Sequence, residues 1–459
     1  MQIIDLLKSQ ELFFYKGNTL DVEKRILILK KLRKNIEIHE DAILNALKSD
    51  FGKSEYEGYM TELSMIYLEL KEFISKTKRW AKPKKVISSI INFPSCEFVQ
   101  KQPFGKVLII APWNYPFLLA IQPLIAAIAT GNVVVLKPSE LTPATSTIIK
   151  KIVEETFSPE WVSVIEGGID VTTEILAQRF DKIFFTGSTA VGKIIHQAAA
   201  KYLTPVVLEL GGKSPCIITA SANLEIAAKR IVFGKFVNAG QTCIAPDFIW
   251  IEEKIKDTFL KLLKARIIES YGEDIENNPD FPRIINTNNF NRLKSYLTNG
   301  TVYFGGQTNV DTNFIAPTIL DNISFKDEVM QDEIFGPILP ILTYTQLEDV
   351  VKHNHETEKP LAFYIFSGDK KEIDFLQKNT QFGGGCVNDV LSHIINKRVP
   401  FGGFGNSGMG NYHGKFGFDT FSHSRGFVER KTWLDIPIKY APYNKKMPIL
   451  KKFFALLKR

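Results

Sequence analysis

The feature that most constrains the fold of this chain is an alternation of short apolar runs with longer amphipathic segments, which begins near residue 105. The runs are predicted to be strands because they are short, rich in β-branched residues and bounded by turns. They are apolar at successive positions, as strands covered on both faces of a parallel sheet are. The predicted strands are Val107–Ala111, Val133–Lys137, Trp161–Ile165, Lys182–Phe185 and Val206–Leu210. With helices between them, at 121–130, 142–157 and 172–179, the pattern predicts βαβ units in a doubly wound sheet.

The chain is long enough for more than one core. Its 459 residues exceed what a single hydrophobic core usually organises, so two or three domains are expected. Before the alternating series, residues 21–36 and 60–74 carry apolar side chains at helical spacing. A second α/β series follows Gly211, with predicted strands at Cys216–Thr219, Phe248–Ile251, Val302–Phe304, Ile338–Tyr344 and Leu361–Phe366.

Charge and cysteine content narrow the classes of function. The net charge is +7, and residues 426–459, with nine basic and two acidic residues, account for all of it. A neutral remainder argues against a nucleic-acid-binding surface. The four scattered cysteines fit neither a disulfide framework nor a zinc site. Because charged residues interrupt the apolar N-terminal segment, we expect no signal peptide and a cytoplasmic protein with reduced thiols.

Two segments are candidates for binding a cofactor. In KIFFTGSTAVG, at 182–192, Gly187 allows a tight turn before a helix whose N-terminus would offer free N–H groups to an anion. The pattern differs from the common G-x-G-x-x-G fingerprint, so an ordinary connection is an equal alternative for this segment alone. In VVVLKPSE, at 133–140, Lys137 and Glu140 follow a strand and could bind the hydroxyls of an adenosine ribose. Two such segments at one sheet edge favour cofactor binding.

Cys243 is the candidate nucleophile. It lies in FVNAGQTCIAP, past a predicted helix that ends near Gly240, in a polar setting that suits a partly exposed thiolate. Most free cysteines are buried packing residues, which is the role expected for Cys96 and Cys216. Cys386, in FGGGCVNDV, stays undecided because glycines can bring the backbone near a ligand.

Three polar residues could assist such a thiol. Glu209 ends an apolar strand, where a carboxylate must be paired or functional; it could be a general base for water or form an ion pair with Lys213. Asn114 also follows a strand, and its amide could donate to an oxyanion or merely complete a turn. Glu333, in QDEIFGPILP, could bind a ribose, act as a second base or cap a turn.

Together these segments resemble the aldehyde dehydrogenase superfamily, and the resemblance is closest to its short, class 3 type. Six motifs stand in the family's order and spacing: APWNYP around Asn114, KPSE at 137–140, FTGS at 185–188, LELGGKSP at 208–215, GQTCIAPD at 240–247 and EIFGPILP at 333–340. The segment FGGFGNSGMGNYHGKFGFDTFSH, at 401–423, is similar to the C-terminal signature of class 3. The resemblance covers nearly the whole chain.

The resemblance implies an α/β fold with two Rossmann-like open-sheet domains and a small bridging β-hairpin, assembled as a homodimer. The implied boundaries are 1–81 and 105–209 for the NAD(P)-binding domain, 210–400 for the catalytic domain, 82–104 and 420–437 for the bridging element, and 438–459 for a basic amphipathic tail.

The resemblance also implies a role for each site residue. Cys243 would be the nucleophile, with Asn114 and the backbone N–H of Cys243 as oxyanion donors. Glu209 would be the general base, and Glu333 is a rival that also contacts the nicotinamide ribose; the assignment is left open. His413 matches a signature position but receives no chemical role. The implied cofactor residues are Lys137, Glu140, Gly187, Ser188, Gly192, Leu210, Glu333, Phe335 and Phe401.

The predicted reaction oxidises an apolar aldehyde, medium- or long-chain aliphatic or aromatic, to a carboxylic acid through a thiohemiacetal and a thioester on Cys243, without a metal. Because the Glu140 carboxylate would bind a ribose 2′-hydroxyl and repel a 2′-phosphate, NAD should be preferred and NADP tolerated. One alternative is a dehydrogenase in which CoA or phosphate intercepts the thioester; the presence of Glu209 argues against it. The other is a non-catalytic NAD-binding protein, which the complete set of Cys243, Asn114 and Glu209 disfavours.

The C-terminal segment KKMPILKKFFALLKR combines apolar residues with six basic ones. A basic amphipathic helix of this length is too short to span a bilayer and lies on an anionic membrane surface or docks on its own protein. In membrane-bound class 3 relatives such a helix lies beside the substrate mouth. The resemblance therefore implies peripheral membrane contact and fatty aldehydes, with packing on the dimer partner as an equal alternative.

Overall fold

The structure is a computed structural model that describes residues 3–457. The chain divides into two units, one formed by the residues up to Ala81 with Gln102–His423, and one by Lys82–Lys101 with the chain from Ser424 onward. The roles predicted above for the domains stay predictions.

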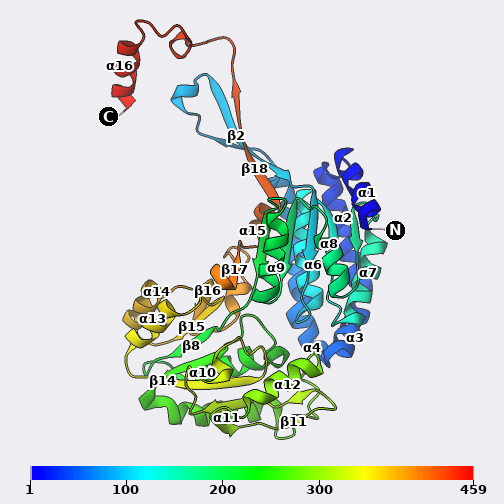
Figure 1. Cartoon of the computed structure of the whole chain (residues 1–459), viewed down its shortest axis with the longest axis vertical. Helices are drawn as coiled ribbons and strands as arrows, with labels where there is room; N and C mark the ends of the chain where they lie inside the picture. Colours follow the sequence, from blue (N-terminus) through cyan, green and yellow to red (C-terminus); the bar gives the residue numbers. More distant parts are fainter. Residues whose placement is uncertain (1–2, 458–459) are drawn as a thin grey trace. The chain divides into compact units, whose positions relative to one another are not determined.

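A six-stranded sheet in the order β17-β7-β6-β3-β4-β5 forms the first half of the larger unit. Figure 1 labels its edge strand β17. Its strands are β3 (Lys106–Ile110), β4 (Val133–Lys137), β5 (Val162–Val164), β6 (Lys182–Thr186), β7 (Val206–Glu209) and the short β17 (Gly408–Met409). Neighbouring strands pair in parallel, except for β17, which pairs antiparallel with β7. The strands predicted in this region and their doubly wound arrangement are confirmed.

Helices cover both faces of this sheet, which is why its strands are apolar at successive positions. In β3, Val107 and Ile109 pack on one face, and Leu108 and Ile110 pack on the other. The first face is covered by α2 (Val22–Ile38), α5 (Ser64–Trp80), α6 (Pro116–Thr130) and α7 (Pro143–Thr156). The second is covered by α1 (Ile3–Tyr15), α8 (Ile169–Leu176) and α9 (Thr189–Ala200).

Helix α6 begins at Pro116, five residues before its predicted start at residue 121. Proline is well tolerated at a first helical position because the N–H that it lacks has no partner within the helix. The buried Glu62 carboxylate accepts hydrogen bonds from the next two N–H groups, of Phe117 and Leu118, at 2.9 and 3.0 Å. A long-range contact that sequence periodicity does not reveal therefore satisfies the start of this helix.

A seven-stranded sheet in the order β10-β13-β14-β9-β8-β15-β16 forms the second half of the larger unit. Its strands are β8 (Pro215–Ile218), β9 (Phe248–Glu252), β10 (Thr301–Phe304), β13 (Thr318–Asp321), β14 (Ile338–Tyr344), β15 (Ala362–Phe366) and β16 (Gly384–Val387). Its helices include α10 (Leu224–Phe236), α11 (Lys256–Tyr271), α12 (Thr287–Tyr296), α13 (Leu347–Glu356) and α14 (Lys370–Asn379). The sequence predicted neither β13 nor β16, and the glycines of β16 resemble a loop. A Cβ at Gly385 would overlap with the carbonyl oxygen of Phe363 in β15, so glycine allows this pairing.

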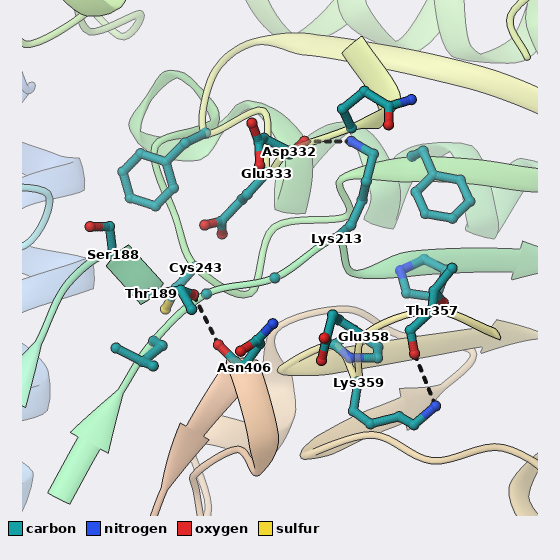
Figure 2. A pocket seen from close by; sticks show the side chains of 18 of the residues that line it. Ser188, Thr189, Lys213, Cys243, Asp332, Glu333, Thr357, Glu358, Lys359 and Asn406 are labelled. Atoms are coloured by element: carbon teal, nitrogen blue, oxygen red, sulfur yellow. Dashed lines mark hydrogen bonds between the residues drawn. The ribbon is translucent and has the colours of Figure 1, made fainter. Parts of the chain in front are cut away.

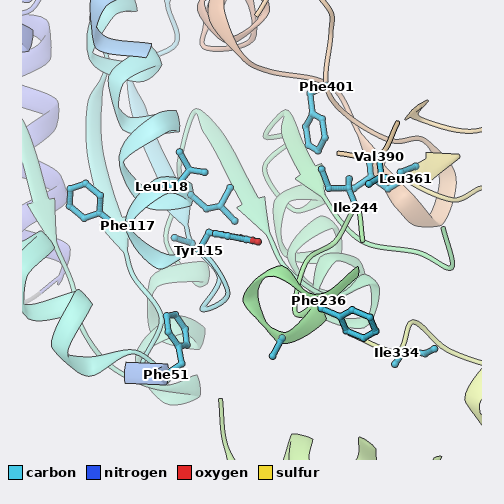
Figure 3. Close-up of a cluster of buried hydrophobic side chains, with 14 of the residues drawn as sticks. Phe51, Tyr115, Phe117, Leu118, Phe236, Ile244, Ile334, Leu361, Val390 and Phe401 are labelled. Carbon is cyan, nitrogen blue, oxygen red and sulfur yellow. The ribbon is translucent and has the colours of Figure 1, made fainter. Parts of the chain in front are cut away.

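The core continues from the first sheet to the second. Tyr115, just before α6, and Ile244, just after Cys243, belong to the same buried cluster as Phe401 (Figure 3). The segments that carry the candidate site residues therefore rest on a packed apolar base.

The smaller unit contains a three-stranded sheet in the order β1-β2-β18. Its strands are β1 (Lys84–Val86), β2 (Ser95–Pro103) and β18 (Ser422–Arg430), and α16 (Met447–Leu457) follows in the chain. Arg425 donates a hydrogen bond to Gln100 at 2.8 Å, and the rings of Phe98 and Phe427 stack with centroids 5.4 Å apart. Within residues 3–457, no helix is long and apolar enough to cross a membrane.

Candidate active site

A cavity of about 1150 Å³, large enough for a ligand beyond drug size, lies in the larger unit and is lined by residues of both its sheets. It receives most of the predicted site residues, namely Asn114, Gly187, Ser188, Glu209, Leu210, Cys243, Glu333 and Phe335. Four predicted site residues are not among the described residues that line the cavity, namely Lys137, Glu140, Gly192 and Phe401.

The parallel register of the first sheet explains this convergence. Ile110 at the end of β3 is aligned with Lys137 of β4 and lies next to Phe185 of β6. Thr186, the last residue of β6, is aligned with Glu209 of β7. The chain thus leaves all four strands at one edge, where open α/β sheets bind ligands.

The N-terminus of α9 opens into this cavity and fits a phosphate group. Ser188 caps the helix by accepting from the Val191 N–H at 3.4 Å, and Ser188 and Thr189 line the cavity (Figure 2). Free N–H groups and the helix dipole favour an anion here. A Cβ at Gly187 would lie 2.5 Å from the Phe185 ring, so a larger residue does not fit at this turn.

Two predicted cofactor residues next to this loop have other immediate roles in the structure. A Cβ at Gly192 would lie 2.7 Å from Leu210, so Gly192 allows α9 to approach the chain after β7. Lys137 is buried and its ammonium lies 2.6 Å from the Glu140 carboxylate. Burial raises the pKa of Glu140, but the hydrogen bond from Lys137, a backbone hydrogen bond and the charge of Lys137 together outweigh it and leave the pKa below its usual value. Glu140 is therefore a charged acceptor at the sheet edge.

Cys243 lies in a turn whose backbone is unusual. The preceding segment, Val237–Gly240, contains left-handed Asn238 and Ala239, at φ 55° and 50°. The Glu57 carboxylate accepts from the Asn238 N–H at 3.0 Å and holds this segment in place. Such conformations persist only where the surrounding structure enforces them, and they are common at functional sites.

The Cys243 side chain is partly exposed, as its polar sequence context suggested, but its pKa favours a thiol over the suggested thiolate. The residue is half-buried and lines the cavity. Burial raises the pKa of the thiol, and the nearby carboxylates of Glu333 and then Glu209 raise it further. The resting group is therefore a thiol that needs a base to become a nucleophile.

The side chain of Asn114 is held by a hydrogen bond that uses only one of its two N–H donors. Its side-chain Nδ2 donates to the Gln241 backbone carbonyl at 3.0 Å. The backbone carbonyl of Asn114 accepts from Asn238 Nδ2 at 2.9 Å. An amide nitrogen carries two hydrogens, so one hydrogen of Asn114 remains for a ligand in the cavity.

The two candidate bases differ in their surroundings, because Glu209 is buried whereas Glu333 is half-buried. Neither carboxylate oxygen of Glu209 has a hydrogen-bond partner among the described residues, and burial raises its pKa well above the usual value. The alternative of a Glu209–Lys213 ion pair is wrong, because Lys213 pairs with Asp247 at 2.7 Å. Burial and the nearby Asp247 raise the pKa of Glu333 to about 8.

Of the two aromatic residues predicted to flank the nicotinamide, only Phe335 lines the cavity. Phe335, with a left-handed φ of 51°, lines the cavity and packs edge-on against Trp113, with ring centroids 5.2 Å apart. Phe401 is buried instead and lies 5.2 Å from the His413 ring. Burial lowers the pKa of His413 to about 3, so its ring is neutral.

Sequence reasoning missed two supporting residues, Asp247 and Asn238. Asp247 is buried, and its carboxylate accepts from the Ile334 N–H at 3.0 Å, next to Glu333. Its position just before the apolar run of β9 carried the same signal that marked Glu209, a carboxylate in buried surroundings. Asn238 gave no comparable signal, because its role depends on contacts with Asn114 that are distant in sequence.

Residues 8–426 match the aldehyde dehydrogenase family. The chain is similar to a 4,4′-diaponeurosporen-aldehyde dehydrogenase of Staphylococcus aureus, with 45% identity over 96% of this chain and 97% of that protein. It is also similar to aldehyde dehydrogenase family 3 member A2 of Pongo abelii, with 44% identity over 97% of this chain and 92% of the relative. A solved structure described as the substrate-bound state of Staphylococcus aureus AldH superposes with a TM-score of 0.97, at 44% identity, over 99% of this chain and 100% of that one.

Proposed function

The chain belongs to the aldehyde dehydrogenase family, and we propose that it oxidises medium- or long-chain apolar aldehydes to carboxylic acids through a thioester on Cys243. The enzyme class and the use of NAD(P) follow from its membership of this family. The observation that carries the proposed mechanism is the convergence of Cys243, Asn114, Glu209 and Glu333 on one cavity.

The residues at the α9 end of the cavity fit NAD(P). Gly187, Ser188 and the N–H groups of α9 would hold its phosphates, and Phe335 would flank the nicotinamide. Lys137 and Glu140, at the neighbouring strand end, would hold the adenosine ribose. The charge on Glu140 supports a preference for NAD over NADP, because a carboxylate repels a 2′-phosphate.

The proposed reaction begins at the Cys243 thiol. A neighbouring carboxylate takes its proton, and the sulfur attacks the aldehyde carbon to form a C–S bond. The carbonyl electrons move to oxygen, which accepts hydrogen bonds from Asn114 Nδ2 and the Cys243 N–H. When bound, NAD(P) supplies the hydride acceptor that makes the resulting thiohemiacetal a thioester.

Hydrolysis of the thioester needs a base for water. Glu333 is favoured by its pKa of about 8, close to working pH, and by its influence on the Cys243 thiol, which exceeds that of Glu209. Glu209 is the second candidate, since its carboxylate lines the same cavity. Water loses a proton to the base and attacks the thioester carbon, and the C–S bond breaks to release the acid. A role for CoA or phosphate finds no support in these contacts.

The proposed substrate class rests on the sequence similarity to the Staphylococcus aureus relative and on the exposed apolar residues of α16. The Staphylococcus aureus relative is named for 4,4′-diaponeurosporen-aldehyde. In α16, Met447, Ile449 and Phe454 are exposed, beside Lys451 and Lys452. We infer that this helix contacts an anionic membrane surface on the cytoplasmic side, where apolar aldehydes concentrate.

We also infer that the protein is a homodimer. The smaller unit exposes several apolar side chains on and near its three-stranded sheet. Their exposure supports an interface in which a second subunit buries them. These side chains include Val86, Ile87, Phe427 and Val428.

One experiment tests the reaction. Reduced cofactor is measured spectroscopically with aldehydes from acetaldehyde to hexadecanal and with benzaldehyde, for the wild type, Cys243→Ala and the control Cys96→Ala. We expect activity that rises with chain length, survives in Cys96→Ala and is lost in Cys243→Ala. Activity that appears only after CoA or phosphate is added would contradict hydrolysis of the thioester. Deletion of residues 445–459 tests the membrane proposal, because liposome binding unchanged by the deletion would contradict it.

A further inference from the structure

The segment that carries Glu333 has no regular secondary structure to hold it. Residues 331–337, between the short helix Glu328–Met330 and β14, belong to neither a helix nor a strand. Glu333 is nevertheless half-buried and lines the same cavity as Cys243 (Figure 2), where its charge raises the pKa of the thiol. A carboxylate with this role needs a fixed position, so other groups must hold the segment.

Lys213 holds the segment before Glu333. Its ammonium donates to the carbonyl oxygens of Val329 and Asp332, each at 2.8 Å, and to Asp247 Oδ2 at 2.7 Å. Figure 2 marks the bond to Asp332. An ammonium has three hydrogens, so all of its donors are used in this arrangement.

Asp247 holds the segment on the other side of Glu333. Its Oδ1 accepts from the Ile334 N–H at 3.0 Å, while its Oδ2 accepts from Lys213. Asp247 lies four residues after Cys243, and its own N–H donates to the Ser214 carbonyl at 2.8 Å. One ion pair therefore joins the turn that carries the nucleophile to both flanks of the Glu333 residue.

We propose that the Lys213–Asp247 ion pair is a positioning device that sets the spacing between the Cys243 thiol and the Glu333 carboxylate. The inference rests on the proposed role of Glu333 next to Cys243. Neither member of the pair reacts; both hold the peptide groups on either side of Glu333, and their charges also act on its pKa, which Asp247 raises and Lys213 lowers. Loss of the pair displaces the carboxylate, and misplacement of a catalytic group by about 1 Å lowers a rate on the order of 100-fold.

The test is a double-mutant cycle between Lys213→Met and Glu333→Gln. The first readout is the rate of thioester hydrolysis after the initial burst of reduced cofactor. The second is the rate at which iodoacetamide alkylates Cys243 in the cofactor-free protein. We expect Lys213→Met to change both rates in the wild-type background and to have no further effect in the Glu333→Gln background. Lys213→Arg, which keeps the donors, should restore part of the hydrolysis rate.

Lys256→Met is the matched control. Lys256 forms an ion pair with Asp321 at 2.6 Å, and its side chain is 20% exposed, against 19% for Lys213. Neither Lys256 nor Asp321 is among the residues that line the cavity. The control should leave both rates unchanged.

The inference would be overturned if Lys213→Met changed the two rates as much in the Glu333→Gln background as in the wild type. It would also be overturned if Lys256→Met changed the rates as much as Lys213→Met does. If Lys213→Met does not fold, Asp247→Asn, which keeps the side-chain shape, takes its place in the cycle. The alkylation readout separates this inference from the proposed function. A protein without aldehyde oxidation that still shows the coupled alkylation rates would retain the positioning role and lose the proposed reaction.

Discussion

The hydroxyl groups of Tyr115 and Thr242 lie 2.7 Å apart in a buried hydrogen bond. Tyr115 follows Asn114 in the chain and Thr242 precedes Cys243, so the bond joins the neighbours of the proposed oxyanion donor and nucleophile. Asn238 provides a second link, because its side chain donates to the carbonyl of Asn114 and to that of Gln241. Asn114 Nδ2 donates in turn to the Gln241 carbonyl, so three hydrogen bonds join the two segments besides apolar packing.

Tyr115→Phe removes one of these links while it keeps the ring. Because a buried hydroxyl of Thr242 loses its partner, we expect the free energy of unfolding to fall by about 1 kcal/mol. The looser spacing between Asn114 and Cys243 should lower kcat by about threefold to tenfold, with less effect on KM. Tyr56→Phe, at an exposed position, is the control. An unchanged kcat in Tyr115→Phe would contradict a role for the bond in catalysis.

Gly211→Ala should displace Glu333. A Cβ at Gly211 would overlap with Oε2 of the Glu333 carboxylate, so the side chain has to move away. We expect a loss of steady-state turnover on the order of 100-fold in a folded protein, measured with circular dichroism alongside the kinetics. Gly168→Ala is the matched control, since nothing lies within 4 Å of its Cβ position. Full activity in Gly211→Ala would mean that the observed position of Glu333 is not required.

The pH dependence of hydrolysis distinguishes Glu333 from Glu209. The pKa of Glu333 is about 8, so its carboxyl is protonated and inactive as a base below that pH. If it is the base, the rate of thioester hydrolysis rises with pH through about 8 and then levels off. Glu333→Gln should abolish this rise, whereas Glu209→Gln should keep it. The reverse pattern in rapid-mixing kinetics would assign the base to Glu209.

The raised pKa of Glu333 also makes the free energy of unfolding depend on pH. Because the pKa of Glu333 is raised from 4.5 to about 8, the folded protein keeps a proton that the unfolded chain has lost in this range. The contribution of the protonated group to stability is therefore complete below pH 4.5 and is lost as pH rises toward 8. Thermal unfolding midpoints at pH 5 and pH 8 should show Glu333→Gln gaining stability relative to the wild type at the higher pH. A constant difference would contradict the shift.

Glu140→Ala should change the cofactor preference. Removal of the carboxylate ends the repulsion of a 2′-phosphate and the hydrogen bond to a 2′-hydroxyl. We expect kcat/KM to fall with NAD and to rise with NADP, by roughly tenfold in their ratio. Glu154→Ala, an exposed acidic residue of α7, is the control for net charge. Wild-type kinetics in which NADP is at least as efficient as NAD would contradict the proposed preference.

Much of the fold followed from local patterns. The parallel strands could be predicted because a run such as Val133–Lys137 is apolar at every position but its last, which requires cover on both faces. Edge elements were harder, because β16 is rich in glycine and pairs only where β15 lies beside it. The start of α6 depends on Glu62, which is distant in sequence and supplies the acceptors that periodicity cannot reveal.

The sequence by itself determined the family and the identity of the candidate residues, because motifs around Asn114, Glu209 and Cys243 need particular side chains at particular chain positions. Only the tertiary structure decided how these residues are charged and held. A pKa depends on burial and on neighbouring charges, and hydrogen-bond partners such as Lys213 and Asp247 become neighbours only when the chain folds. The physical reason is that chemical identity is local in the chain, whereas desolvation and positioning are properties of the packed molecule.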